Sequence, residues 1–173
     1  MPLEKVGHIE PNMENIERTL DEFENELVNF DREVAVVITK DGDIFRFNGG
    51  INNVNPDLLG ESRKGASDFH NHPKNETNYS FSVLDAGHFW ENEMAISRSG
   101  DYMYRYSMRR TNDTVKATQA EIITEFKKVR NAEVWKLAYY EKIDMDIDGY
   151  HEIILRLADK YKFKYERTKR NDS

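Results

Sequence analysis

Two histidines separated by a single residue, His70 and His72, are the side chains of this sequence best suited to metal chemistry. Side chains alternate along an extended chain, so both imidazoles project from the same face of a strand. Pro73 follows directly and favours the end of that strand, because proline cannot donate a ladder hydrogen bond. After a polar loop, Asp85 lies near the start of an apolar, helix-like run. Two imidazoles and one carboxylate are the protein ligands of an open, catalytic type of zinc site.

A zinc hydrolase also needs a base and a group that stabilises the oxyanion. Glu33 directly precedes a buried apolar strand, where partial desolvation suits a carboxylate to this role. Glu61 is the alternative base. The hydroxyl of Ser82 is the candidate oxyanion donor, with Ser80 as its alternative. Ser82 and Asp85 also match a helix N-cap with an acidic third residue, and both roles are compatible.

The other histidines carry weaker signals. His88 shares a helix face with Asp85, so a further ligand or a supporting hydrogen-bond donor is one interpretation, and an ordinary core or surface histidine is the other. His8 and His151 have no supporting neighbours, and we expect both at the surface. The contiguous letters His-Asn-His do not indicate an HNH nuclease, because that class is named for separated residues.

Charge and composition exclude several classes of protein. The 173-residue chain has a net charge of -7, and its only basic stretch, residues 160–170, is expected to be solvated. Nucleic acid is therefore not an expected partner. The absence of cysteine excludes disulfides, thiolate metal sites and a cysteine nucleophile. With no apolar run near the roughly 20 residues that span a bilayer and no signal pattern, we expect a cytoplasmic protein without a membrane partner.

The first third of the chain predicts a helix and a hairpin. Residues 1–12 show no periodicity and are interpreted as an irregular N-terminal arm. Apolar residues at steps of three and four predict a helix from Met13 to Phe30, which packs on a sheet or, alternatively, forms a dimer. Glu33–Thr39 and Ile44–Phe47 then predict two strands joined by a tight turn.

The elements that follow position the candidate ligands. The long connection 49–65 has the character of a functional loop. Residues 67–70 predict a short strand that ends at the histidine pair, and residues 82–90 predict a helix that carries Asp85.

A second hairpin is predicted next, from strands 94–97 and 102–108 and a turn at 99–101. Tyr102, Tyr104 and Tyr106 share one strand face, which indicates core packing with hydroxyls reaching solvent, or alternatively a binding surface. Beyond it, residues 111–173 are predicted to be helical to the end, a helical extension that suits partner docking or a homodimer.

Together these residues resemble the signature of the JAB/MPN metalloprotease family, also called JAMM. Its pattern is matched by Glu33, by His70-Asn71-His72-Pro73 and by Ser82-Val83-Leu84-Asp85. The form of the motif is similar to a prokaryotic branch found in RadC-like, phage and mobile-element proteins. The resemblance covers residues 33–110. Nine residues separate His72 from Ser82, about two more than is usual, and a polar loop absorbs such an insertion at little cost.

The resemblance implies a zinc-dependent hydrolase of amide bonds, often isopeptide bonds to a ubiquitin-like protein. Zn²⁺ would be bound by His70, His72 and Asp85, with Glu33 and Ser82 as catalytic residues. The implied fold is α+β and three-layer-like, a mixed β-sheet flanked by helices in the cytidine-deaminase-like JAB/MPN arrangement.

In this interpretation an arm (1–12), a metallohydrolase domain (13–110) and a helical extension (111–173) make up the chain. A phage or mobile-element binding or assembly module is the alternative function. Hydrolysis of a non-protein amide, such as a deamination, is a third, because substrate choice lies in loops such as 49–65.

Overall fold

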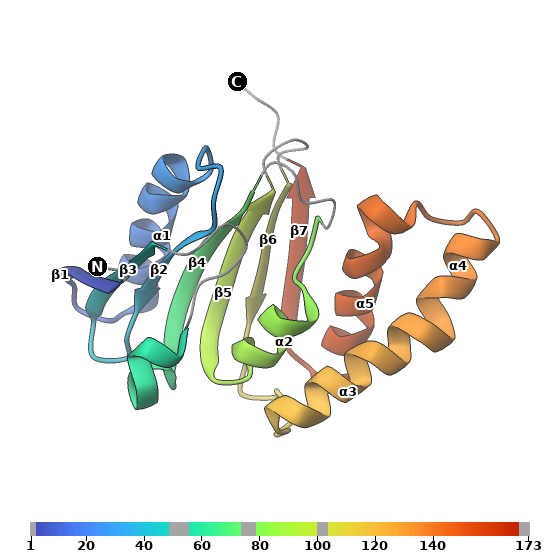
Figure 1. Cartoon of the computed structure of the whole chain (residues 1–173). Helices are drawn as coiled ribbons and strands as arrows, with labels where there is room; N and C mark the ends of the chain where they lie inside the picture. The colour runs from blue at the N-terminus through green and yellow to red at the C-terminus, as the bar shows by residue number, and fades with distance from the viewer. Residues whose placement is uncertain (1–2, 49–55, 74–78, 100–103, 170–173) are drawn as a thin grey trace.

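One mixed sheet organises the molecule (Figure 1). The computed structural model describes residues 3–48, 56–73, 79–99 and 104–169. In this part of the chain the sheet has the strand order β1-β3-β2-β4-β5-β6-β7, and β4 and β5 are its parallel pair. The strands are β1 (Leu3–His8), β2 (Val34–Ile38), β3 (Asp43–Asn48), β4 (Ala66–His72), β5 (Asn92–Ser99), β6 (Tyr104–Arg109) and β7 (Lys164–Lys169).

Helices cover both faces of this sheet, so the predicted α+β class with a mixed, helix-flanked sheet is confirmed. One helix, α1, packs on one face, and the remaining helical elements lie over the other (Figure 1). No helix in the described ranges is long and apolar enough to cross a membrane. The helical elements are α1 (Met13–Leu27), the 3₁₀ segment η1 (Pro56–Arg63), α2 (Val83–Phe89), α3 (Gln119–Val129), the π-helical turn η2 (Arg130–Val134), α4 (Trp135–Tyr139) and α5 (Met145–Tyr161).

The first helix and hairpin form as the apolar pattern predicts. Val34, Val36 and Ile38 of β2 pack against α1, while the intervening residues of β2 face the opposite side of the sheet. The turn to β3 requires Gly42, which has a φ of 91°. A Cβ at this position would lie 1.9 Å from the carbonyl oxygen of Ile9, so no other residue fits.

Strand β4 lies at the centre and delivers the histidine pair. It is antiparallel to β2, with Ala35 opposite His70, and parallel to β5. A parallel pair needs a crossover connection, and helix α2 lies in the connection between β4 and β5. The C-terminal end of β4 and the N-terminal end of α2 therefore meet at one edge, where open α/β sheets commonly place ligands.

Both ends of the chain differ from the prediction. Residues 3–8, predicted to be part of an irregular arm, form strand β1 against β3. Residues 164–169, predicted to be helical, form strand β7 against β6. Each is an edge strand that exposes most of its side chains, so neither shows the apolar alternation from which a strand is predicted. Charged residues are common on such edges because they discourage pairing with other chains.

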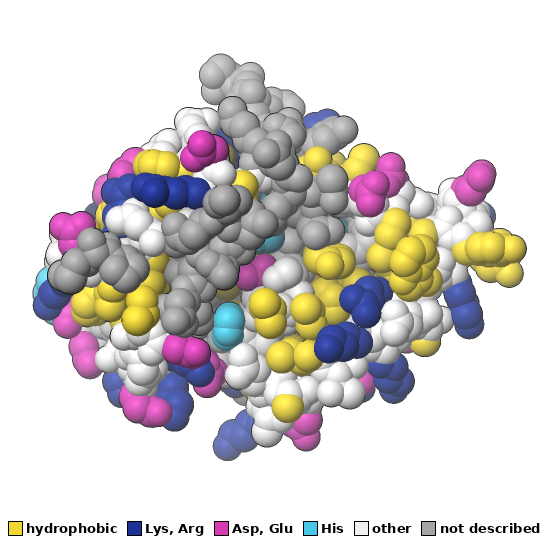
Figure 2. All heavy atoms as spheres, in the orientation of Figure 1, with side chains coloured by type: hydrophobic (Ala, Val, Ile, Leu, Met, Phe, Trp, Pro, Cys, Tyr) yellow, Lys and Arg dark blue, Asp and Glu magenta, His cyan; other side chains and the backbone are white. Residues whose placement is uncertain are grey.

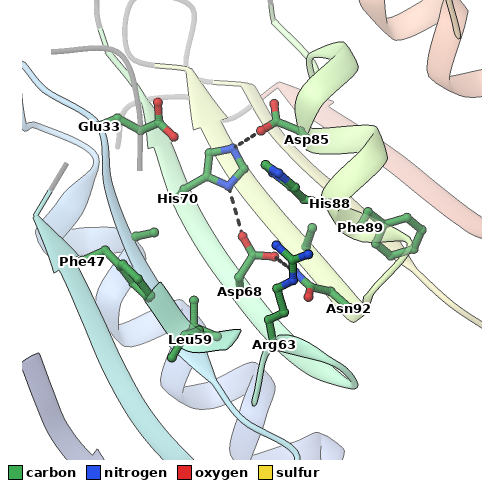
Figure 3. Close-up of a pocket in the computed structure, with 13 residues that line it drawn as sticks. Glu33, Phe47, Leu59, Arg63, Asp68, His70, Asp85, His88, Phe89 and Asn92 are labelled. Carbon is green, nitrogen blue, oxygen red and sulfur yellow. Dashed lines mark hydrogen bonds and ion pairs between the residues drawn. The ribbon is translucent and has the colours of Figure 1, made fainter. Parts of the chain in front are cut away.

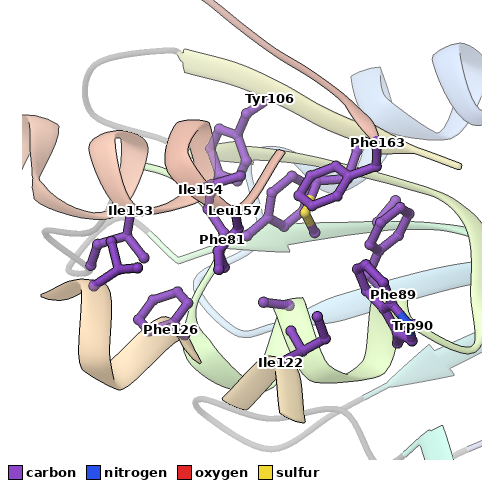
Figure 4. Packing of buried hydrophobic residues seen from close by; sticks show 14 of the residues in the cluster. Phe81, Phe89, Trp90, Tyr106, Ile122, Phe126, Ile153, Ile154, Leu157 and Phe163 are labelled. Atoms are coloured by element: carbon purple, nitrogen blue, oxygen red, sulfur yellow. The ribbon is translucent and has the colours of Figure 1, made fainter. Parts of the chain in front are cut away.

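Residues beyond position 110 share a core with the segment that carries Asp85. Figure 4 shows Phe81 and Phe89 packed with side chains from α3 and α5. Helices α2 and α3 approach closely at Gly87, where a Cβ would lie 3.1 Å from Ile123 Cδ1. The cluster also includes Tyr106, Met108, Ile122, Phe126, Ile153, Ile154, Leu157 and Phe163.

Candidate metal centre

The side chains of His70, His72 and Asp85 converge on one point. The two imidazole Nε2 atoms are 3.1 Å apart, and they lie 3.3 and 3.4 Å from Asp85 Oδ1 and Oδ2 respectively. Zinc–ligand bonds of about 2.0–2.2 Å at tetrahedral angles place ligand atoms roughly 3.3–3.6 Å from one another. The three side chains therefore have nearly the spacing that a tetrahedral metal ion requires, and they form a group able to hold one.

Hydrogen bonds on the far side of each ring orient the two histidines. His70 Nδ1 lies 3.2 Å from Asp68 Oδ2, and Asp68 also accepts a hydrogen bond from the Asn92 amide. Because a carboxylate only accepts, Nδ1 of His70 carries a proton, and in the neutral imidazole Nε2 is then the nitrogen with the lone pair that a metal ion requires. His72 Nδ1 lies 2.7 Å from the hydroxyl of Tyr106, which accommodates the same tautomer. Such partners typically set the orientation of metal-binding histidines.

The electrostatics of the cluster favour a cation. Burial by itself lowers the pKa of His70, but the negative charges of Asp85 and Asp68 raise this pKa well above its ordinary value. Burial raises the pKa of Asp85, and the two histidines nevertheless hold it well below the usual range. Asp85 is therefore a carboxylate, and positive charge between the three side chains is stabilised.

A capping box positions Asp85 at the start of α2. The Ser82 hydroxyl accepts a hydrogen bond from the Asp85 backbone N–H at 3.2 Å, and the Ser82 backbone N–H donates to Asp85 Oδ2 at 2.7 Å. The predicted N-cap is thus confirmed. Because one carboxylate oxygen is held by the cap, the carboxyl group cannot rotate away from the histidines without breaking this bond.

Glu33 lies beside the same point. It lines one cavity with His70 and Asp85, and Figure 3 shows its carboxylate on one side of His70 with Asp85 on the other. The structure thus brings together four of the predicted site residues, the three ligands and the candidate base.

The residue between the two histidines fixes the chain on both sides of Glu33, a role that sequence reasoning missed. Asn71 is completely buried. Its Oδ1 accepts from the Val34 backbone N–H at 2.7 Å, and its Nδ2 donates to the carbonyls of Arg32 at 2.9 Å and Phe30 at 3.3 Å. The strand that carries the candidate ligands therefore also positions the candidate base. The one available signal was an amide side chain between two candidate ligands.

The alternatives for the base and the oxyanion donor lie elsewhere. Glu61 is exposed, pairs with Lys64 and is not among the residues that line the cavity. Ser80 is fully buried, and its hydroxyl lies 2.7 Å from that of Tyr165 on β7. Ser82 is only partly buried. Residues 74–78 of the preceding loop, which is about two residues longer than the family pattern, lie outside the described ranges.

The remaining histidines are placed as follows. His88 lines the cavity but does not belong to the three-residue metal group. His8 is exposed beside Asp43, as predicted. His151 is partly buried, and its Nδ1 lies 2.9 Å from the Tyr165 hydroxyl, so its assignment to the surface was wrong.

The tyrosine face of β6 also differs from its prediction. Tyr106 is fully buried, and its hydroxyl meets His72 rather than solvent. Tyr102 lies outside the described residues. The partner of Tyr106 is remote in sequence, and no local pattern reports such a contact.

Comparison with known proteins gives no match: no protein-family model fits the chain, and neither a curated protein nor a solved structure matches it significantly. Membership of the JAB/MPN family therefore stays a prediction, based on the motif. The functional assignment depends on the geometry of the site.

Proposed function

We propose that the protein is a zinc-dependent metallopeptidase or isopeptidase of the JAB/MPN type, which hydrolyses an amide bond in a protein or peptide substrate. The observation that supports this most strongly is the convergence of His70, His72 and Asp85 at nearly tetrahedral spacing, with Glu33 on the same cavity. A structural zinc site needs four protein ligands, whereas this group offers three and a neighbouring carboxylate.

His70, His72 and Asp85 would hold the ion. Bound zinc lowers the pKa of a water ligand toward about 7 and polarises a carbonyl oxygen. Neutral imidazoles and a carboxylate suit zinc. The hydrogen bonds that the two Nδ1 atoms make to Asp68 and Tyr106 would keep both Nε2 atoms directed at the ion.

Glu33 acts as the general base and then as the general acid. Its carboxylate takes the proton of the attacking water and delivers it to the leaving amine. Asn71 holds the backbone on both sides of Glu33, so that the carboxylate stays beside the reacting carbon.

Ser82 stabilises the oxyanion. Its Oγ already accepts from the backbone N–H of Asp85, which leaves the hydroxyl proton to be donated to the oxygen of the attacked carbonyl. The same capping bond fixes the position of this hydroxyl relative to the ligand helix.

The finer fold assignment is part of this proposal. The motif glutamate directly precedes β2, the histidines end β4 and the aspartate opens α2, each in the context that the JAB/MPN signature implies. We therefore assign the sheet to the cytidine-deaminase-like arrangement of that family.

Metal analysis combined with one isosteric substitution tests the function. We expect about one zinc per chain by elemental analysis. Glu33→Gln should keep the metal and lose cleavage of a mixed peptide and isopeptide library, whereas Glu61→Gln should keep both. A protein that takes up no zinc would refute the proposal, and so would undiminished cleavage by Glu33→Gln.

An assembly module is the second candidate function, and exposed aromatic side chains favour it. Trp135, Tyr139 and Tyr140 on and directly after α4 are 53%, 80% and 68% exposed. Figure 2 shows hydrophobic side chains gathered at this end of the molecule. If the protein acts as a homodimer formed through its helical segments, the double variant Tyr139→Ser/Tyr140→Ser should be monomeric in light scattering and should keep its metal content.

A further inference from the structure

An apolar cavity extends from the metal centre along the face of the sheet. Glu33, His70 and Asp85 stand at one end of it, and it runs between η1 and α2 (Figure 3). Its apolar walls are formed by Ala35, Val37, Phe47, Leu59, Phe89 and Ala95.

Small side chains in the sheet open this space. In the strand register, Ala35 lies opposite His70, and Ala95 lies beside Asp68. On the opposite face, the same two strands carry larger residues such as Val36 and Ile96, which fill the contact with α1. Alanine at both positions leaves volume directly next to the candidate ligands.

Arg63 and Asp68 also line the cavity, and their charges are compensated within the protein. Arg63 pairs with Glu91 at 2.5 Å and with Asp57 at 2.7 Å. Asp68 is held by His70 and by the amide of Asn92. Because these groups already have partners of opposite charge or polarity, the cavity offers little to a charged occupant and favours an apolar one.

The volume fits one side chain. The cavity measures about 70 Å³. One water molecule requires at least roughly 10–15 Å³ on this measure, so the cavity accepts a group of several heavy atoms. The side chains of leucine and phenylalanine are groups of this kind, whereas glycine would leave the space unfilled.

We propose that this cavity receives an uncharged apolar side chain, between leucine and phenylalanine in size, from a substrate residue next to the scissile bond. The inference rests on the proposed function, because it assumes that the amide is bound at the metal centre. It defines the substrate class as proteins or peptides with such a residue beside the cleaved bond.

The proposal is tested by titrating the zinc-loaded protein with three hydroxamates that differ only in their tails and measuring their affinities by calorimetry. Acetohydroxamate has almost no tail, 4-methylpentanohydroxamate carries an apolar tail, and 6-aminohexanohydroxamate carries a charged one. Burial of the apolar tail should strengthen binding by roughly 10–100-fold over acetohydroxamate. The charged tail should give no gain.

Two neighbouring leucines provide a matched pair of variants. Leu59 lines the cavity and is partly buried, whereas Leu58 is 46% exposed and is not among the lining residues. Leu59→Asp should remove most of the gain from the apolar tail, and Leu58→Asp should preserve it. Ala95→Val, which narrows the cavity from the sheet, should reduce the gain as a second and chemically different change.

The outcomes separate this inference from the proposed function. Equal affinity for acetohydroxamate and the apolar-tailed compound would overturn the inference and leave the metal centre intact. A gain that survives both Leu59→Asp and Ala95→Val would also overturn it. If no hydroxamate binds and no zinc is retained, the proposed function fails, and the inference fails with it.

Discussion

Removal of one hydroxyl group, by Tyr106→Phe, should weaken zinc binding without unfolding the protein. The hydroxyl lies 2.7 Å from His72 Nδ1 and receives a hydrogen bond from Ser97 Oγ at 3.3 Å. The ring is fully buried and packs edge-on against Phe81 with centroids 4.9 Å apart. Phenylalanine keeps this packing, so the substitution mainly removes the orientation of His72.

The expected magnitude follows from the role of such hydrogen bonds. Loss of a partner that orients a metal-binding histidine typically lowers metal affinity 10–100-fold, or about 1.4–2.7 kcal/mol. Competition with a chromogenic chelator measures the zinc affinity, and thermal unfolding of the metal-free protein measures the cost to the fold. We expect a clear loss of affinity with a much smaller change in the stability of the metal-free state.

Tyr104→Phe is the matched control. Tyr104 lies on the same face of β6, is partly buried and stacks under the Arg167 guanidinium, 4.4 Å from the ring centroid. Its hydroxyl is not among the hydrogen-bond partners of the ligands. An unchanged zinc affinity in Tyr106→Phe would refute the role assigned to the hydroxyl. Equal losses in both variants would instead indicate a general effect on the strand.

Three further predictions concern Asn71, the part of the chain after Arg110, and His151. Asn71→Ala should lower the free energy of unfolding, measured with urea, by about 1–3 kcal/mol for each buried group that it leaves without a partner. It should also lower kcat in the cleavage assay more than it lowers the zinc content found by metal analysis. Truncation after Arg110 removes the α3 and α5 side chains of the core around Phe81 and Phe89, so the fragment should neither fold nor bind zinc, as circular dichroism and metal analysis can show. Burial, helped by the positive charge of Arg167, lowers the pKa of His151 in the folded protein, so the unfolded chain binds the imidazole proton more tightly. The contribution of neutral His151 to stability is therefore complete above about pH 6.5 and is lost as the pH falls through the lowered pKa. Thermal unfolding should therefore show a smaller loss between pH 7 and pH 5.5 in His151→Gln than in the unaltered protein or in the exposed-site control His8→Gln.

Local periodicity explains which elements could be predicted. Helix α1 buries one stripe of side chains, so its apolar residues recur every three or four positions. Strand β2 is buried on both faces, so it appears as a short continuous apolar run. The candidate triad was predictable because two histidines two positions apart on a strand and an aspartate at a helix start match the ligand set of an open zinc site. Strands β1 and β7 expose most of their residues, so their pairing depends on neighbours that are far away in sequence.

Contacts between remote segments explain what was missed. The hydroxyl of Tyr106 and the amide of Asn71 act on groups more than 30 positions away, and the hydroxyl pair of Ser80 and Tyr165 spans 85 positions. Each of these residue types is also common in ordinary cores and turns. Their roles depend on strand order and register, which periodicity does not report.

The third candidate ligand, Asp85, links the candidate metal centre to the part of the chain outside the motif. Asp85 is carried by α2, which approaches α3 through Gly87 and buries Phe89 against the core of the C-terminal helices. A hydrogen bond links the segment before α2 to β7: the Arg167 guanidinium donates to the carbonyl oxygen of Tyr79 at 3.2 Å. A shift of α3 or α5 would therefore move Asp85 relative to the two histidines, whose backbone belongs to β4. If the proposed site binds a metal ion, its affinity should therefore depend on residues 111–169, because they hold Asp85 in place.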